Sequence, residues 1–306
     1  MQMRRRRAGG WIDTPIEWAI RATGILTIAL LVGILLLLLR QGSHLFLDLD
    51  YPLDRFLTFP NAITDNTTDP NAFRFGIMPP LIATLWIMSV TLFFAVPLGI
   101  ASAVFISEVA PPRIRLIVKS VAELLAGVPT VIFAFVGLAL LAPLVRQHLG
   151  WGVGGLSGFT AGLVVAAVAL PLIISIADDT LQAVPRELRE GAYALGSNKL
   201  EVTWFVVMPA AVSGLSAAIM LGMARAIGET MIVLILAGGN SSIPLDPTES
   251  MRPMTATIAS GFGNASDLSL IRPALFMTGT VLFVLTFITT LAADVVLERQ
   301  KRKFGR

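Results

Sequence analysis

Six long apolar stretches constrain this chain more than any other feature of its sequence. They cover residues 18–40, 78–107, 120–145, 159–180, 206–237 and 273–297. A helix needs about 20 apolar residues to cross a hydrocarbon core of about 30 Å, so each stretch can span a membrane. In lipid, every backbone polar group of such a segment must be satisfied internally, as a helix does. The sequence therefore predicts an all-α integral membrane protein with six transmembrane helices.

Composition supports a membrane protein and excludes several other classes. Only 14% of the residues are charged, whereas a soluble domain has about 25%. The chain has no cysteine, which excludes a disulfide framework and a thiolate metal site. No lysine lies in the G-x4-G-K-[ST] pattern that holds nucleotide phosphates, so any ATP hydrolysis would need a separate subunit. The basic residues cluster beside the spans, where they indicate topology rather than a nucleic-acid surface.

The distribution of these basic residues sets the orientation of the spans. If the N-terminus is cytoplasmic and the six spans alternate, fifteen lysines and arginines fall in cytoplasmic segments and six in outer ones. That bias predicts that both termini are cytoplasmic. The first span lacks a small-residue cleavage site, so we expect an anchor rather than a signal peptide. The predicted organisation is a basic N-terminus over 1–17 and a membrane domain over 18–306, with outer loops at 41–77 and 238–272.

The segment between the fourth and fifth spans, about residues 181–205, has the pattern of two short helices rather than a flexible linker. Leu188, Ala192 and Leu195 recur at helical spacing. Gly196 can then end the first helix in the left-handed conformation that glycine adopts readily. A second short helix would lead into the fifth span. The sequence thus predicts a helix-turn-helix elbow with an exposed apolar ridge, which is typical of a surface that binds a partner or the membrane.

The stretch MARAIGETM, residues 223–231, places two charged side chains inside the apolar fifth span. A charge at the bilayer centre costs about 2.5 to 3.5 kcal/mol on insertion scales, so it indicates a functional site by default. The i, i+4 spacing would place Arg225 and Glu229 on one helix face within reach of each other. Thr230 could supply a neutral donor beside them. The planar guanidinium of arginine matches a tetrahedral oxyanion such as phosphate through two parallel hydrogen bonds.

Two interpretations of this pair remain open from the residues alone. In the structural one, Arg225 and Glu229 neutralise each other and fix the packing of the helix. In the functional one, Arg225 offers a transient site to an anion while Glu229 competes for the same guanidinium. Conduction requires such a balance, because a site that binds too tightly does not release. Position and ligand chemistry favour neither interpretation.

The predicted elbow carries a family motif. Glu190, Gly191 and Ala192, followed by Gly196 and Pro209, match the spacing of E-A-A-x3-G-x9-I-x-L-P. This pattern resembles the EAA loop of ABC importer permeases, although glycine replaces its first alanine, and valine and methionine replace its isoleucine and leucine. In that family the loop docks on the ATP-hydrolysing subunit. The resemblance implies a type I ABC importer permease fold, with these five residues in the coupling to the ATPase.

Longer stretches narrow the resemblance to one branch of the family. FGIMPPLIATLW, PLGIASAVFISEVAPPRIR, ELLAGVPTVIFAFVGL and MARAIGETM look like the membrane subunits of the phosphate-specific (Pst-type) importer, its C-type more than its A-type. The resemblance covers about residues 76–298. It implies a non-catalytic permease of the bacterial inner membrane that transports phosphate, and it favours the functional interpretation of Arg225, Glu229 and Thr230.

The same resemblance implies a set of partners. These are a second homologous permease, a dimer of ATP-binding subunits, an extracytoplasmic phosphate-binding protein, phosphate and membrane lipid, with no nucleic acid. It implies no cofactor in this chain, since ATP and Mg would be bound by the partner ATPase. The alternatives are the A-type phosphate permease or a permease for molybdate, sulfate or phosphonate. A self-sufficient channel or secondary transporter fits less well, because the elbow has no role in a channel and no inverted repeat is apparent.

Overall fold

The computed structural model describes residues 10–62, 73–265 and 270–304, and its regular structure there is helical apart from isolated β-bridges. The helices are α1 (Gly10–Leu47), α2 (Leu53–Thr58), α3 (Met78–Val104), α4 (Pro112–Ala126), α5 (Thr130–Val136), α6 (Ala142–His148), α7 (Gly158–Gln182), α8 (Arg186–Ala194), α9 (Lys199–Val202), α10 (Met208–Ala210), α11 (Val212–Gly228), α12 (Met231–Leu236), α13 (Met254–Asn264) and α14 (Ile271–Phe304). The π-helical segments η1 (Phe105–Val109), η2 (Gly137–Leu141) and η3 (Thr203–Val207) follow α3, α5 and α9. The all-α prediction is confirmed.

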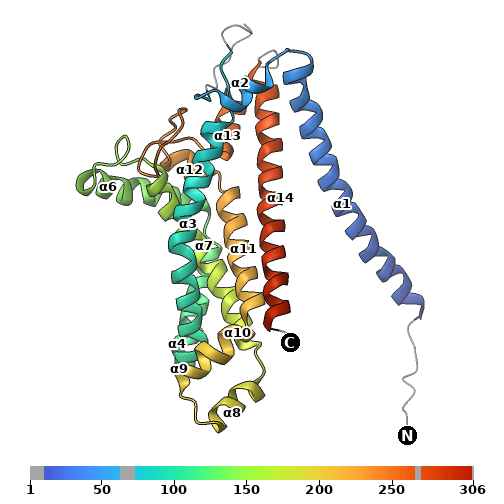
Figure 1. Ribbon diagram of the computed structural model, residues 1–306, viewed down its shortest axis with the longest axis vertical. Helices are drawn as coiled ribbons and strands as arrows, with labels where there is room; N and C mark the ends of the chain where they lie inside the picture. The colour runs from blue at the N-terminus through green and yellow to red at the C-terminus, as the bar shows by residue number, and fades with distance from the viewer. Residues whose placement is uncertain (1–9, 63–72, 266–269, 305–306) are drawn as a thin grey trace.

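Five helical segments of the described residues are long and apolar enough to cross a membrane: Glu17–Leu47, Met78–Val109, Thr130–His148, Gly158–Gln182 and Ile271–Ala292. A sixth crossing arises if Lys199–Ala210 and Val212–Gly228, which are bent by 71°, count as one broken span. The start of α1 and the end of α14 both point toward the end of the molecule that holds α8 and α9 (Figure 1). This arrangement agrees with six crossings and two cytoplasmic termini. The arginine run Arg4–Arg7 lies outside the described residues.

Two predicted spans are not continuous helices. The third, expected over 120–145, is divided because α4 ends at Ala126 and α5 begins after Pro129. Proline is tolerated there because the first residues of a helix have no intrahelical partner for their N–H groups. The fifth, expected over 206–237, is interrupted at Ala211 and again between α11 and α12.

Other boundaries also differ from the sequence prediction. The first helix is longer than residues 18–40, since α1 covers Gly10–Leu47. The segment 238–272, expected to be an outer loop, contains the helix α13. This helix packs against α14, α12 and α3. Part of the predicted loop therefore belongs to the folded bundle.

Close contacts between α3, α7 and α11 form the centre of the bundle. A Cβ atom on Gly99 would lie 2.6 Å from Ile173, and one on Gly162 would lie 2.7 Å from Val90. A Cβ on Gly222 of α11 would likewise lie 2.6 Å from Ile173. Small residues allow such close approach of membrane helices, whose association gains little from the hydrophobic effect. The three helices therefore form one closely packed unit, whereas α1 packs on α14 and leans away from the bundle (Figure 1).

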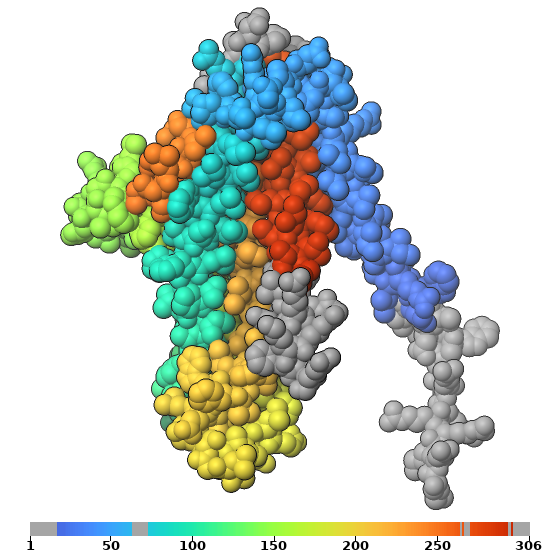
Figure 2. Space-filling model, in the orientation of Figure 1, coloured from blue at the N-terminus to red at the C-terminus, as the bar shows by residue number. Residues whose placement is uncertain are grey.

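The described part of the outer loop 41–77 forms an aromatic cap over the outer end of the bundle. Tyr51, Phe56, Phe73 and Phe75 are buried there, and the Tyr51 hydroxyl donates to the Phe75 carbonyl at 2.9 Å. These aromatic residues share a core with the first turns of α14. Figure 2 shows the blue residues of the cap lying across the top of the bundle. The described part of the loop therefore packs on the outer ends of the spans.

Candidate functional site

The fifth span is broken at the charged stretch MARAIGETM. Helix α11 ends at Gly228, and Glu229 has an extended backbone with φ −68° and ψ 129° before α12 begins at Met231. Irregular backbone at membrane depth is tolerated only where protein buries it or it lines a cavity. The Thr255 hydroxyl on α13 donates to the Glu229 carbonyl at 2.8 Å, so a neighbouring helix satisfies one backbone group of the break.

The predicted pairing of Arg225 with Glu229 on one helix face is wrong in this structure. The helix ends before Glu229, so the i, i+4 geometry does not apply. The Arg225 side chain is exposed, whereas Glu229 is buried at 6% exposure. Among the described residues, no ion pair joins the two. A Glu229 carboxylate oxygen instead accepts from the Ile232 N–H at 3.4 Å, at the start of α12.

Arg225 is a cation within the apolar fifth span that has no ion-pair partner among the described residues. Arg225 lies in the last turn of α11, and α11 ends well short of the outer end of α14 (Figure 1). A guanidinium always stays charged and cannot be left facing hydrocarbon without large cost, so it must meet water, an anion or another chain. Thr230 lies at the break, half-buried, and its hydroxyl donates to the Gly228 carbonyl at 3.4 Å.

The predicted helix-turn-helix elbow is present as α8, a turn and α9. Gly196 has φ +89°, the left-handed conformation predicted for it. The Gly196 N–H donates to the Tyr193 carbonyl at 3.0 Å and the Ser197 N–H to the Ala192 carbonyl at 3.2 Å. These two bonds form the Schellman motif that ends many helices. Asn198 then starts α9 through a capping box with Glu201.

The elbow lies at one end of the molecule (Figure 1), and several of its apolar side chains are exposed. Leu195 is 90% exposed, Leu200 68% and Phe205 78%. Leu188 is also exposed, as predicted, whereas Ala192 packs partly against the core. Exposed apolar side chains at this density are typical of a surface that another protein covers.

The other residues of the EAA-like pattern lie where that surface is built. Glu190 and Gly191 are exposed on α8, and no atom lies within 4 Å of a Cβ placed on Gly191. Pro209 is half-buried near the start of the short helix α10, just before the 71° bend of the fifth span. The pattern therefore covers the elbow and its junction with the broken span.

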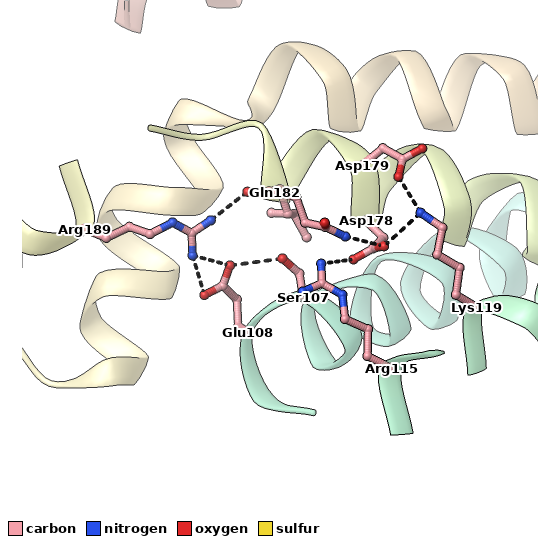
Figure 3. A network of polar contacts seen from close by, with 9 residues as sticks. Ser107, Glu108, Arg115, Lys119, Asp178, Asp179, Gln182 and Arg189 are labelled. Carbon is pink, nitrogen blue, oxygen red and sulfur yellow. Dashed lines mark hydrogen bonds and ion pairs between the residues drawn. The ribbon is translucent and has the colours of Figure 1, made fainter. Parts of the chain in front are cut away.

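A buried polar network beside the elbow was missed by sequence reasoning (Figure 3). Asp178, near the end of α7, is only 1% exposed. Its carboxylate accepts from Arg115 Nη2 at 3.4 Å and from Gln182 Nε2 at 2.6 Å. Lys119 Nζ donates to Asp179 at 2.7 Å. These bonds fasten α4 to the cytoplasmic end of α7.

The pKa of Lys119 reflects this arrangement. The hydrogen bond that Lys119 donates to Asp179 raises this pKa above its ordinary value, and the negative charges of Asp179, Asp178 and Glu123 act in the same direction against the effect of burial. The ammonium group therefore remains charged throughout the physiological pH range. No local pattern indicates this contact, since the two partners lie 60 residues apart in the chain.

The sequence of this chain is similar to those of known membrane transport proteins. Residues 95–302 match the family described as the binding-protein-dependent transport system inner membrane component. The probable ABC transporter permease protein YqgH of Bacillus subtilis is 33% identical over 283 residues, covering 92% of this chain and 90% of that protein. The phosphate transport system permease protein PstC of Pasteurella multocida is 32% identical over 272 residues, covering 83% and 84%.

Solved structures show a similar fold. The crystal structure of a bacterial alginate ABC transporter, in complex with a periplasmic protein bound to alginate pentasaccharide, aligns over 96% of this chain and 97% of its own. The TM-score is 0.60 and the sequence identity 15%. At that identity the likeness concerns the arrangement of helices alone.

Proposed function

Because the chain belongs to the family of binding-protein-dependent transport system inner membrane components, we propose that it is the permease subunit of an ATP-driven importer of inorganic phosphate. The chain is a permease of an ABC importer and a multi-pass protein of the bacterial inner membrane. The predicted Pst-type family membership and type I permease fold are confirmed. Phosphate as the substrate is the step beyond the family, and it is supported by the relative named as a phosphate transport system permease.

The exposed guanidinium of Arg225 at the end of α11 is the observation that carries this proposal. It has no ion-pair partner among the described residues, so its N–H donors are available to an anion. A guanidinium binds the oxygens of phosphate through two parallel charge-assisted hydrogen bonds. The broken helix beside it is the kind of irregular backbone that lines cavities in membrane proteins. A phosphate ion would therefore meet Arg225 on its way through the membrane.

Glu229 and Thr230 have supporting roles in this proposal. Glu229 is buried across the break from Arg225, and a movement that brought its carboxylate to the guanidinium would displace a bound anion. Release requires such competition, because a conducting site must bind weakly enough to let the ion leave. The Thr230 hydroxyl could donate to the anion in place of its long 3.4 Å bond to the Gly228 carbonyl.

The exposed elbow supports a complex in which other chains hydrolyse ATP and this chain provides the membrane path. Its exposed ridge would dock on a dimer of ATP-binding subunits, which would hold ATP and Mg, while this chain carries out no catalysis. A second homologous permease would complete the pathway, and a phosphate-binding protein would deliver the ion to the outer face. Glu190, Gly191, Ala192, Gly196 and Pro209 would form or support the docking surface for the ATPase.

The proposed substrate can be tested by uptake into vesicles that contain the complete complex and enclose ATP. We expect labelled phosphate to accumulate only when the binding protein and ATP are both present. Unlabelled phosphate should abolish the uptake of label, whereas the same excess of sulfate, molybdate or a phosphonate should leave most of it. Competition is needed because an arginine alone binds any tetrahedral oxyanion.

Two results would contradict the proposal. Accumulation of labelled molybdate, sulfate or phosphonate in place of phosphate would assign the permease to another oxyanion. Phosphate uptake by this chain alone, with neither ATPase nor binding protein present, would favour a channel or a secondary transporter. Whether the chain acts as the C-type or the A-type subunit is decided by which second permease restores uptake when the two are reconstituted together.

A further inference from the structure

Helix α8 has few means of holding its position against the membrane helices. None of its residues is fully buried; Leu188 faces solvent, and Ala192 packs only partly against the core. It packs on η3 and α9, the elements that follow it in the chain. Within α8, all of which the structure describes, ion pairing is confined to Arg189. The orientation of α8 relative to the bundle therefore depends strongly on what Arg189 contacts.

Arg189 contacts two separate membrane helices at once (Figure 3). Its Nη1 donates to both carboxylate oxygens of Glu108, each at 2.7 Å, and its Nη2 donates to the Leu181 carbonyl at 2.7 Å. Glu108 lies in η1, the π-helical continuation of α3, and Leu181 lies in the last turn of α7. One side chain thus joins α8 to the ends of both α3 and α7.

Because Glu108 is buried, loss of its ion pair with Arg189 would be strongly unfavourable. The Glu108 side chain is 6% exposed and that of Arg189 20% exposed. Removal of Arg189 would leave this buried carboxylate with the Ser107 hydroxyl, at 3.2 Å, as its one remaining side-chain partner among the described residues, and an uncompensated buried charge is strongly unfavourable. The π-helical turn that presents Glu108 is an uncommon feature, and such turns often occur at functional sites.

A lysine could not replace this arginine. The planar fork of the guanidinium reaches the Glu108 carboxylate and the Leu181 carbonyl with two different nitrogens, each at 2.7 Å. An ammonium group is a single point of charge and cannot hold both acceptors in that geometry. The arrangement therefore specifies the position of α8 as well as neutralising a buried acid.

We propose that the Arg189–Glu108 pair positions α8 on the α3–α7 unit, so that a displacement of α8 by the ATPase moves these helices with it. The inference rests on the proposed function, because it takes α8 to be the element that meets the ATPase. α3 and α7 both pack on α11, the helix that carries Arg225. Arg189 and Glu108 are thus positioning residues that link ATP hydrolysis to the anion site, with no contact to either ligand.

The position of α8 can be measured directly because the chain has no cysteine. Ser197→Cys in the turn after α8 and Ser120→Cys on the exposed surface of α4 would carry one spin label each. α4 is a suitable reference because Lys119 fastens it to α7. In the assembled complex we expect one narrow distance distribution between the labels. Arg189→Ala should broaden it. Arg113→Ala should not, because Arg113 is an exposed arginine on α4 with no ion pair among the described residues.

The same complexes should also differ in coupling. We expect Arg189→Ala and Arg189→Lys to lower phosphate uptake per ATP hydrolysed by about tenfold, a factor within the usual range of coupling between sites. Glu108→Gln keeps the shape of the side chain and should cause a smaller loss in the same direction, which protects the test if the alanine variant folds poorly. Arg113→Ala should leave the ratio unchanged.

A double variant separates positioning from charge neutralisation. Arg189→Met combined with Glu108→Met removes both charges, so a merely neutralising pair would regain the narrow distance distribution and normal coupling. Our proposal expects an assembled complex with a broad distribution and poor coupling. A narrow distribution in the double variant would overturn the inference. The spin-label distances are measured without substrate. They therefore test the positioning role of the Arg189–Glu108 pair even if the transported ion is not phosphate.

Discussion

Replacing Arg225 with lysine is expected to remove most phosphate transport although the positive charge remains. A compact ammonium group lacks the planar fork that gives two parallel hydrogen bonds to an oxyanion. A hydrogen bond to a charged group contributes about 1.5 to 3 kcal/mol, so losing one corresponds to a loss of roughly tenfold or more. ATP-dependent uptake of labelled phosphate, normalised to the amount of assembled complex, would measure the effect.

A second set of variants separates loss of the anion site from loss of a buried ion pair. If Arg225 and Glu229 were a buried pair, removal of one partner would leave an unpaired charge that costs about 3 to 5 kcal/mol and would lower the amount of complex. The described residues show no such pair, because Arg225 is exposed and Glu229 follows the helix end. Arg225→Met, alone or with Glu229→Gln, should therefore assemble in near-normal amount yet transport little. Near-normal uptake by the double variant would show that Arg225 and Glu229 serve helix packing and take no part in the phosphate path.

Replacing Gly196 with valine is expected to uncouple ATP hydrolysis from transport. Gly196 has φ +89°, where a β-branched side chain is strained; left-handed backbone costs roughly 1 to 2 kcal/mol for a residue with a Cβ. Relief of that strain would rotate Leu195 and α9 away from their present positions. We expect a membrane-inserted chain that either releases the ATPase or permits hydrolysis without uptake.

A matched control exists for the glycine substitution. Gly33 lies in the middle of α1, and a Cβ placed there has no atom within 4 Å. Gly33→Val makes the same chemical change in an open helical position, so uptake per ATP should stay normal. If Gly196→Val also kept normal uptake per ATP, the elbow would not be the element that couples to the ATPase.

Local sequence predicted the elbow well because its structure depends on local chemistry. Gly196 ends α8 through its own backbone conformation, and the Asn198–Glu201 capping box starts α9 within one turn. The spans were also predictable in number, since length and apolarity alone determine whether a helix can cross a bilayer. These features require little information about distant parts of the chain.

The break between α11 and α12 could not be predicted in this way. The residues before it suit a continuous helix, and the interruption is supported by α13, where Thr255 donates to the Glu229 carbonyl. Pro129 is a local signal for the division between α4 and α5, but proline also occurs within continuous membrane helices, so it does not by itself predict the division. Arg189 and Glu108 are 81 residues apart, so only tertiary structure brings them together. The fold class was thus accessible from sequence, whereas the geometry of the α11–α12 break and of the Arg189–Glu108 contact was not.

If phosphate passes Arg225, position 225 faces an aqueous path through the assembled transporter. Since the chain has no cysteine, Arg225→Cys provides a single thiol for a charged, water-soluble reagent. Ile25→Cys on α1 is the control, because Ile25 is an exposed apolar residue, 69% exposed, on a candidate span. We predict rapid modification of Cys at 225 and little at 25 in the complete complex. An unreactive thiol at position 225, with both positions open to an apolar reagent, would show that Arg225 faces lipid and does not line the path of the ion.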